Sequence, residues 1–239
     1  MMRRIDELGV KIFADGADLE SMQELSRLPF IKGFTTNTAL MRKAGVGEYR
    51  DFARRAIDAA GDRDISFSAL SDDIDEMERQ AHEIAGWGEH VYVKIPVTNT
   101  RGESCEDLVR RLAHSGVKVN VTAMLSLAQV RVMANAVAGG APATVSIFAG
   151  RVADTGRDPV PLMAAAVELL RVASNAELIW ASPRELFNIF HADAIGCHII
   201  TVTHDLLAKL PLVGRDLEQY SLETVKMFHD EAVRAGYRL

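Results

Sequence analysis

Residues 91–97 read Val-Tyr-Val-Lys-Ile-Pro-Val, and Lys94 is the one charged side chain in this run. Apolar and β-branched residues stand at nearly every position instead of alternating with polar ones. This is typical of a parallel strand that is covered on both faces. A lysine is rarely buried completely unless it has a partner or a chemical task. The run therefore predicts a parallel sheet and makes Lys94 the first candidate for chemistry.

Seven further apolar runs predict strands along the chain. They occupy residues 10–14, 31–36, 65–70, 117–123, 143–149, 177–181 and 198–202. Apolar residues at helical spacing lie between these runs, as at Leu162, Ala166 and Leu169. Strand and helix thus alternate eight times in about 200 residues without a Pro-, Gly- or Ser-rich linker. This pattern favours an α/β fold of the (β/α)8 TIM-barrel type over an open doubly wound sheet.

Helix boundaries in the sequence agree with this arrangement. The polar cluster at residues 71–73 precedes Ile74 as an N-cap signal. Asp158 and Pro159 open a helix that is predicted over residues 160–174, since proline suits the first turn of a helix.

A single domain is expected over residues 1–239, because barrels of this length commonly form one domain. Residues 217–235 carry an apolar stripe beyond what eight strand and helix units require. The stripe consists of Leu222, Val225, Phe228 and Ala232 at helical spacing. We expect a C-terminal helical extension over about residues 215–239, packed on the barrel or on a neighbouring subunit.

Composition excludes several classes of partner. The net charge of −6 argues against binding to nucleic acid or anionic lipid, because both need dense clusters of Lys and Arg. Cys105 and Cys197 lack CxxC spacing, and no secretory signal is recognisable, so a reducing cytoplasm fits best. No apolar run reaches the roughly 18 residues that a membrane span needs. We expect a cytoplasmic protein without nucleic-acid or membrane partners.

Polar side chains close or interrupt seven of the eight predicted strands. They are Asp15, Thr36 with Asn37, Ser68, Lys94, Asn120 with Thr122, Ser146, and Ser182. In a parallel barrel the carboxyl ends of the strands meet at one face, which carries the active site. The pattern predicts a ring of side chains around one cavity, suited to a polyhydroxylated substrate.

Two interpretations of Lys94 follow from its surroundings. As a structural residue, it reaches solvent or pairs with a carboxylate. As a functional residue, it has a pKa lowered by burial and is a neutral amine that attacks a carbonyl to form an imine. Asp15 is open to two interpretations as well. It either moves protons on substrate hydroxyls in a retro-aldol cleavage or caps the helix that begins near Asp18 or Leu19.

Arg151 and Arg184 each follow a strand end, where a guanidinium can bind phosphate through two hydrogen bonds. A single loop arginine is more often simply solvated, but the pair together with Ser182 favours a phosphate site. His191 and His198 lack the spacing of zinc ligands, so we expect no metal site.

These residues resemble those of the small transaldolases and fructose-6-phosphate aldolases, class I enzymes of sugar phosphate metabolism, over nearly the whole chain. The matching segments are Phe13-Ala14-Asp15, Gly33-Phe34-Thr35-Thr36-Asn37, Val93-Lys94-Ile95-Pro96-Val97-Thr98, Asn120-Val121-Thr122, Gly150-Arg151 through Asp154, and Ala181-Ser182-Pro183-Arg184. The Thr-Thr-Asn and Lys-Ile-Pro-Val-Thr pieces in this order are highly specific together.

The resemblance implies roles for the matching residues. Lys94 would form the Schiff base, Asp15 would act as acid and base, and Asn37, after Thr36, would contact substrate hydroxyls. The remaining roles are orientation of the imine and the catalytic water by Asn120 and Thr122, substrate contact by Ser146, and binding of an anionic sugar by Arg151, Ser182 and Arg184. No metal or organic cofactor is implied, because the imine itself is the electron sink. Small members of this family assemble into rings through C-terminal helices, which implies a homo-oligomer.

Three departures from the family pattern stand out. Thr38-Ala39 replaces the usual Pro-Ser after the asparagine, and Pro183 stands where an aromatic residue is common. Ser68 aligns with the glutamate of transaldolases and the glutamine of the aldolases, which hold the catalytic water. A serine is too short to hold that water in the same way unless a second water intervenes.

Phe148 matches the phenylalanine of transaldolases rather than the tyrosine of the aldolases and favours transfer. The implied reaction is therefore transfer of a three-carbon dihydroxyacetone unit between sugar phosphates through the lysine imine. Three alternatives stay open: an aldolase that releases dihydroxyacetone, an enzyme for an uncommon biosynthetic sugar, and a non-catalytic barrel that binds a sugar phosphate. Ser68 is the best support for the non-catalytic barrel, and an enzyme for an uncommon sugar would explain both Ser68 and Pro183.

Overall fold

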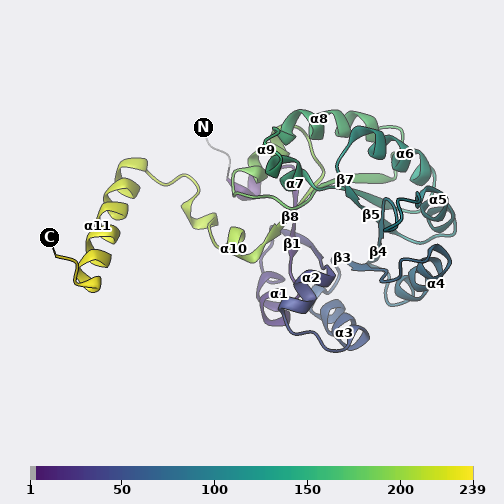
Figure 1. Ribbon diagram of the computed structural model, residues 1–239, viewed down its shortest axis with the longest axis horizontal. Coiled ribbons are helices and arrows are strands. Elements are labelled where there is room, and N and C mark those ends of the chain that lie inside the picture. The colour runs from purple at the N-terminus through teal and green to yellow at the C-terminus, as the bar shows by residue number, and fades with distance from the viewer. Residues whose placement is uncertain (1–3, 239) are drawn as a thin grey trace.

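The computed structural model describes residues 4–238 and contains a closed barrel of eight parallel strands in sequence order (Figure 1). The strands are β1 (Lys11–Asp15), β2 (Ile31–Thr35), β3 (Asp64–Ser68), β4 (Val91–Pro96), β5 (Val119–Met124), β6 (Ala143–Ile147), β7 (Ala176–Trp180) and β8 (Ile199–Thr203). Every predicted apolar run overlaps one of these strands, with ends that differ by a few residues. The prediction of a TIM barrel is confirmed.

Helices cover the outside of the barrel between consecutive strands (Figure 1). They are α1 (Leu19–Leu25), α2 (Thr38–Lys43), α3 (Tyr49–Ala60), α4 (Ile74–Ala85), α5 (Glu106–His114), α6 (Leu127–Val137), α7 (Ala149–Asp154), α8 (Pro159–Leu170) and α9 (Asn188–Ala194). A 3-10 turn η1 (Ile5–Glu7) precedes β1, and α10 (His204–Leu207), η2 (Leu210–Leu212) and α11 (Leu217–Ala235) follow β8.

Side-chain caps set where several helices begin, because a carboxylate can accept a hydrogen bond from a free amide of the first turn. Asp18, Asp73 and Asp158 each accept such a bond at the start of α1, α4 and α8. Pro159 occupies the first turn of α8, as the sequence predicts. That helix ends at Leu170 rather than near residue 174, where a short turn leads into β7.

Small and large side chains are matched inside the barrel. The ring of Phe13 from β1 packs with Ile179 from β7 and Ile199 from β8, so it lies in the barrel interior. A Cβ added at Gly33 would lie 2.5 Å from this ring. The absence of a side chain at Gly33 therefore makes the space for Phe13, and larger residues there would displace the ring.

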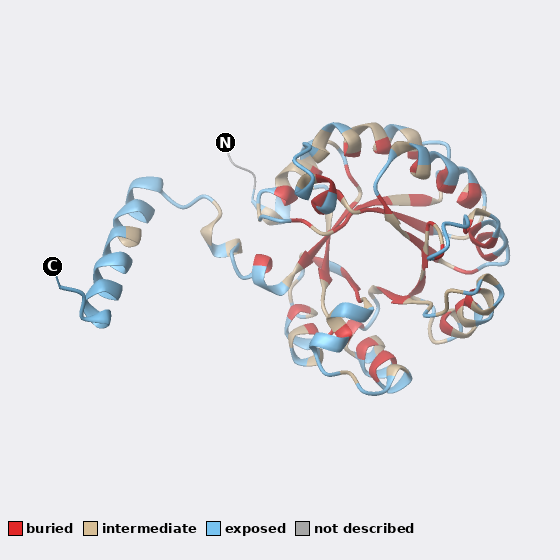
Figure 2. Ribbon diagram, in the orientation of Figure 1, coloured by how far each residue is buried: buried red, intermediate tan, exposed pale blue. Residues whose placement is uncertain are grey.

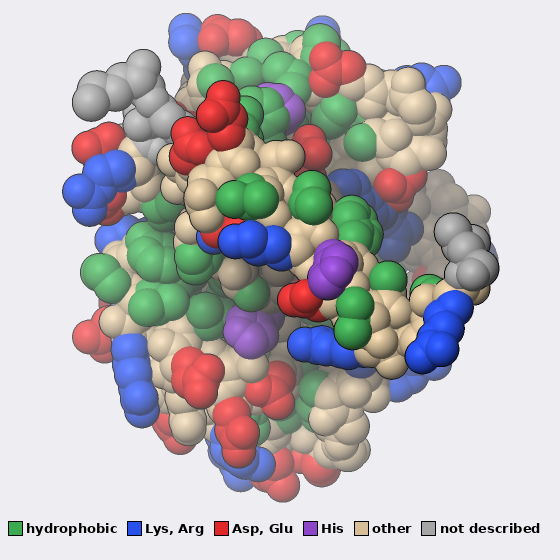
Figure 3. Space-filling model, turned by 90° about the vertical axis from the view of Figure 1, so that its left-hand side faces the viewer, with side chains coloured by type: hydrophobic (Ala, Val, Ile, Leu, Met, Phe, Trp, Pro, Cys, Tyr) green, Lys and Arg blue, Asp and Glu red, His purple; other side chains and the backbone are tan. Residues whose placement is uncertain are grey.

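The last helix, α11, stands apart from the barrel on an extended connection (Figure 1). None of its residues is buried, and Leu222, Val225 and Phe228 of the predicted apolar stripe are 47, 61 and 61 % exposed. Figure 2 shows this helix almost entirely exposed, whereas the barrel strands are buried. Figure 3 views the molecule from that side and shows apolar side chains among acidic and basic ones on its surface. The predicted extra C-terminal helix is thus present, and it does not pack on its own barrel.

No helix within the described residues 4–238 has the length and apolar character needed to cross a bilayer.

Candidate active site

Strand register brings three of the predicted site residues to one level of the barrel. Ser68 on β3 is paired with Lys94 on β4, and Lys94 is paired in turn with Asn120 on β5. Nζ of Lys94 donates a hydrogen bond to the backbone carbonyl of Thr36 at 2.6 Å. Across residues 4–238, Lys94 forms no ion pair with a carboxylate.

The surroundings of Lys94 favour the neutral amine. Burial lowers its pKa, because an ammonium ion loses its hydration inside the barrel, and the negative charge of Asp15 opposes this shift only in part. A neutral amine carries the lone pair that attacks a carbonyl carbon. The surroundings of Lys94 therefore favour the neutral form of the amine that imine formation requires.

Asp15 ends β1 and lies beside the neighbouring strand β2. The hydroxyl of Thr35 donates to the Asp15 carboxylate at 2.7 Å. Burial raises the pKa of Asp15, while the positive charge of Lys94 and the hydrogen bond from Thr35 oppose that shift. Asp18, and not Asp15, caps α1, so the Asp15 carboxylate is left to face the barrel.

A chain of buried hydrogen bonds orients Asn120 in the barrel interior. Ser146 on β6 donates to its side-chain oxygen at 2.7 Å, and its side-chain nitrogen donates to the hydroxyl of Ser66 at 3.0 Å. Because β4 separates β3 from β5, Ser66 and Asn120 can meet only through the interior. Both ends of the amide are occupied, which fixes its orientation.

Backbone distortion marks the end of β5. The pairing with β6 shifts register between Val121 and Met124, and Ala123 has a φ of 66°. A residue other than glycine in this left-handed region costs about 1 kcal/mol or more. This β-bulge lies directly after Thr122, whose side chain is half-buried, and bulges of this kind re-aim a side chain near an active site.

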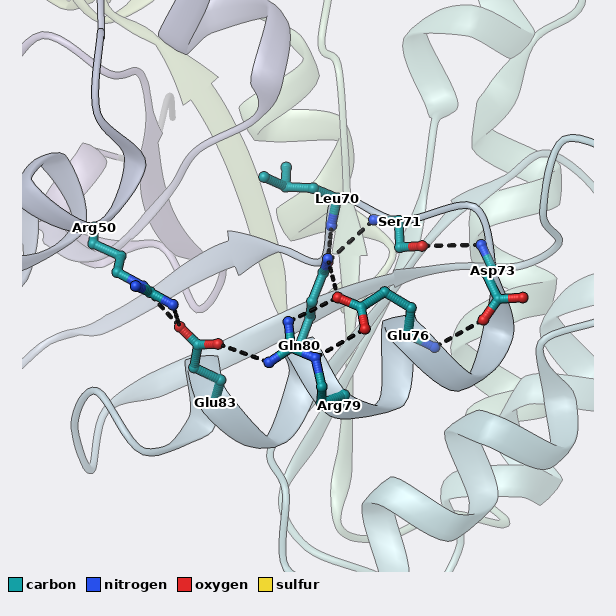
Figure 4. Close-up of polar contacts among 8 residues, drawn as sticks. All are labelled: Arg50, Leu70, Ser71, Asp73, Glu76, Arg79, Gln80 and Glu83. Carbon is teal, nitrogen blue, oxygen red and sulfur yellow. Dashed lines mark hydrogen bonds and ion pairs between the residues drawn. The ribbon is translucent and has the colours of Figure 1, made fainter.

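The end of β3 is held from outside the barrel. The Tyr49 hydroxyl donates to the carbonyl of Ser68 at 2.9 Å. In the loop that follows, the amides of Leu70 and Ser71 donate to the side-chain oxygen of Gln80 at 2.7 and 3.1 Å (Figure 4). Glu76 accepts from the other end of Gln80, so a network on α4 anchors this loop. These hydrogen bonds therefore hold the backbone of Ser68 in place beside Lys94, although the Ser68 side chain itself is short.

Thr36 and Asn37 both form hydrogen bonds that stabilise the local backbone. The Thr36 hydroxyl is fully buried and donates to the carbonyl of Ser66 at 2.9 Å, while its own carbonyl accepts from Lys94. The Asn37 side-chain oxygen accepts from the amide of Leu40 and caps α2. The Asn37 amide nitrogen is the part of that side chain left to contact a ligand.

Two arginines follow β6 and β7 at the carboxyl ends of the strands. The Arg151 guanidinium lies over the ring of Phe148, 5.2 Å from its centroid, and Phe148 packs on the interior cluster around Phe13. Arg184 donates from Nε to the Asp154 carboxylate at 2.9 Å and from Nη2 to its second oxygen. Both guanidinium groups are exposed, and each is oriented by a different partner.

Gly150 allows these two loops to meet. Ser182 has a φ of 56°, and a Cβ added at Gly150 would lie 1.5 Å from the carbonyl oxygen of Ser182 and 3.2 Å from Nε of Arg184. The backbone of α7 therefore touches the loop after β7. This contact holds the start of α7, which carries Arg151, against the loop that carries Ser182 and Arg184.

Replacing Gly150 with alanine is expected to lower the free energy of unfolding by about 1–3 kcal/mol, because the added methyl group forces the two loops apart. Chemical denaturation measures this loss. Gly47→Ala is the matched control, since a Cβ there meets nothing within 4 Å and Gly47 has no positive φ. Equal stability of the two variants would show that the loops separate without strain.

Within the described part of the chain, no group of three or more His, Cys, Asp or Glu side chains could hold a metal ion. His191 stacks on Trp180, and His198 accepts from the amide of Leu178 at 3.0 Å. Both histidines thus have structural contacts.

Sequence reasoning missed several residues that support the site. Ser66 was detectable, because it lies two positions before Ser68 and so faces the same side of the strand. Thr35 was part of the Thr-Thr-Asn segment, but only the structure separates its role from that of Thr36. Tyr49 and Gln80 gave no local signal, since each reaches the end of β3 from a helix outside the barrel.

The chain is similar to known proteins over most of its length. The family described as transaldolase/fructose-6-phosphate aldolase matches residues 12–238. A probable transaldolase of Dehalococcoides mccartyi is 32% identical over 202 residues, covering 84% of this chain and 90% of that protein. A probable transaldolase of Methanococcus maripaludis is 31% identical over 217 residues, covering 88% of this chain and 95% of the relative.

A solved putative lyase/mutase from Burkholderia cenocepacia has a TM-score of 0.59 at 13% identity, covering 96% of this chain and 86% of the other. At that identity the likeness concerns the fold alone. The match over residues 12–238 and the identity with the two probable transaldolases decide the family. The chain belongs to the transaldolase/fructose-6-phosphate aldolase family.

Proposed function

We propose that this chain transfers a three-carbon dihydroxyacetone unit between sugar phosphates through a Schiff base on Lys94. The observation that carries the proposal is the partly buried amine of Lys94 inside the barrel, whose pKa is lowered by desolvation and which interacts electrostatically with Asp15. A barrel that only binds sugar would gain nothing from a desolvated amine, since burying it is unfavourable.

The reaction begins when the neutral Lys94 amine attacks the C2 carbonyl of a ketose phosphate; the carbinolamine then takes up a proton and loses its oxygen as water, which gives the protonated imine. Asp15 takes the proton from the C4 hydroxyl, the C3–C4 bond breaks, and an aldose phosphate leaves. The electron pair of the broken bond stays on the bound three-carbon unit as an enamine. That enamine attacks the aldehyde carbon of a second aldose phosphate, whose oxygen takes the proton from Asp15, and water then hydrolyses the imine.

Other residues have roles in binding and orientation. Asn120, held at both ends of its amide, and Thr122, beside the β-bulge, orient the imine and the water. Ser146 and Asn37 contact substrate hydroxyls. Arg151, Ser182 and Arg184 bind the phosphate, because guanidinium groups and hydroxyls match its oxygen atoms.

A second candidate is an aldolase, or an enzyme for an uncommon sugar, that releases the three-carbon unit as dihydroxyacetone. It shares the first half of the reaction and differs in how water reaches the enamine. Ser68 favours an enzyme for an uncommon sugar, because the short side chain beside Lys94 leaves room where both transaldolases and the aldolases have a longer one. Phe148 favours transfer, so we retain the transaldolase reaction as the main proposal.

Borohydride trapping tests the proposal. The protein is incubated with fructose 6-phosphate or with dihydroxyacetone, reduced with sodium borohydride, and digested for mass spectrometry. A dihydroxyacetone-sized adduct on the Lys94 peptide after incubation with fructose 6-phosphate is the expected result. If neither compound leaves an adduct while unreduced ligand still binds, the non-catalytic barrel or a different sugar becomes the better explanation. Release of free dihydroxyacetone without an acceptor would favour the aldolase.

We further infer that the protein acts in the cytoplasm as a homo-oligomer. The buried thiols of Cys105 and Cys197 are both free, which agrees with a reducing compartment. The unpacked apolar side chains of α11 are the main support for association, because such a surface is usually covered by a partner.

Replacing Val225 and Phe228 of α11 together with glutamate is expected to reduce the mass of the particle in solution, because charged side chains cannot enter an apolar interface. Size-exclusion chromatography with light scattering measures the mass. Lys226→Ala on the same helix is the control. An unchanged mass in the double variant would remove α11 from the interface.

A further inference from the structure

The ion pair between Arg184 and Asp154 joins two loops at the proposed phosphate site. Asp154 ends α7, and Arg184 follows β7, thirty residues later in the chain. Nε of Arg184 donates to one carboxylate oxygen at 2.9 Å, and Nη2 donates to the other oxygen. Both side chains are about half exposed, at 50 and 51 %. An ion pair this exposed contributes little to stability, so its position suggests another role.

The geometry of the pair leaves part of the guanidinium free. A guanidinium has five N–H donors arranged in a plane, and Asp154 occupies the edge formed by Nε and Nη2. The second hydrogen of Nη2 and one hydrogen of Nη1 point the same way and form another edge. That edge can give two parallel hydrogen bonds to a phosphate while the carboxylate holds the first edge.

Two further contacts restrict where Arg184 can lie. Its backbone amide donates to the side-chain oxygen of Asn188 at 2.9 Å, which fixes the start of the side chain. Its Nε lies 3.2 Å from the position that a Cβ of Gly150 would take, so the side chain passes close over α7. Contacts with Asn188, α7 and Asp154 thus hold the backbone amide, the Nε and the guanidinium end of Arg184.

The two arginines of the site differ in charge balance. Arg151 lies over Phe148 and, within the described residues, has no carboxylate partner, whereas Arg184 shares its charge with Asp154. Because a side chain that is already oriented loses less freedom on binding, the carboxylate improves recognition through Arg184.

We propose that Asp154 is a positioning residue that holds the Arg184 guanidinium for recognition of the substrate phosphate. The proposal rests on the phosphate site of the proposed function. It extends that function by assigning a specificity-determining role to a carboxylate within an anion site.

Asp154→Asn tests the proposal, because asparagine keeps the size of the side chain and removes its charge. We expect KM for fructose 6-phosphate to rise about three- to tenfold, because Arg184 loses one of its two fixed bonds. We expect kcat to stay within about twofold and KM for unphosphorylated fructose to stay unchanged, since neither depends on the phosphate contact. Asp51→Asn, which removes a carboxylate from an exposed ion pair on α3, is the matched control.

A double-mutant cycle separates positioning from other effects. In an Arg184→Ala background, Asp154→Asn should leave KM for fructose 6-phosphate unchanged, because there is no guanidinium left to position. A fall in KM in Asp154→Asn would show that the carboxylate competes with phosphate. An unchanged KM, or an equal rise in both backgrounds, would also overturn the proposal.

Borohydride trapping of dihydroxyacetone on Lys94, which lacks a phosphate, runs alongside. If trapping fails in the wild type, the proposed function fails. If trapping succeeds in both proteins and KM does not respond to Asp154→Asn, only the role of Asp154 is lost.

Discussion

Replacing Lys94 with methionine is expected to abolish both the borohydride adduct and turnover, with activity reduced by about 10⁴-fold or more. Methionine has a similar length and no nucleophile, so no imine can form. Steady-state assays with fructose 6-phosphate and an aldose phosphate acceptor measure the loss. Mass spectrometry of the reduced protein confirms that no other lysine takes the substrate.

The same variant makes a prediction about stability. Lys94 is partly buried and donates to a backbone carbonyl, and an apolar side chain of similar volume avoids the desolvation of its charge. Thermal unfolding of Lys94→Met should therefore occur at the wild-type Tm or above it. Lys118→Met is the control, since Lys118 also donates to a backbone carbonyl, at 2.7 Å, but lies at the opposite end of the barrel strands. Activity above about 1% of the wild type in Lys94→Met would remove the lysine from the mechanism.

Replacing Asp15 with asparagine is expected to separate imine formation from bond cleavage. The variant should still trap dihydroxyacetone on Lys94, because the amine is intact. Cleavage should slow by about 10²- to 10⁴-fold, because no carboxylate remains to take the proton from the C4 hydroxyl. Single-turnover release of the aldose phosphate measures the cleavage step.

The pH dependence of trapping checks the electrostatic coupling in Asp15→Asn. The negative charge of Asp15 raises the pKa of Lys94 relative to burial alone, so its removal lowers that pKa further. A lower pKa leaves more neutral amine at a given pH, and the midpoint of the trapping rate should move to lower pH. Asp18→Asn is the control, because asparagine caps a helix about as well as aspartate. A midpoint that moves to higher pH, or cleavage at the wild-type rate, would contradict the assignment of Asp15.

The candidate site was partly readable from the chain. The Thr-Thr-Asn segment pointed to residues 35–37 as a unit, and the structure distributes their tasks. Thr35 donates to Asp15, the Thr36 carbonyl accepts from Lys94, and Asn37 caps α2. Neighbouring residues on a strand face opposite sides, so one motif supplies both a contact to the site and a contact to the scaffold.

The sequence by itself determined the barrel fold, the family, and the position of Lys94 on the fourth barrel strand. Hydrophobic periodicity is a local property, and eight apolar runs separated by helical spacing leave few architectures that can bury them. The polar residues that close or interrupt seven of these runs were readable for the same reason.

Only the tertiary structure decided which side chains meet. The Ser66 hydroxyl contacts Asn120 through the barrel interior, and Asp154 pairs with Arg184 from another loop. Helix α11 stands apart from the barrel, and its apolar stripe does not pack there. These contacts depend on closure of the sheet and on loop geometry that joins residues far apart in the chain. A local sequence pattern does not determine these contacts, because they depend on how strands and loops that are distant in the chain are arranged in space.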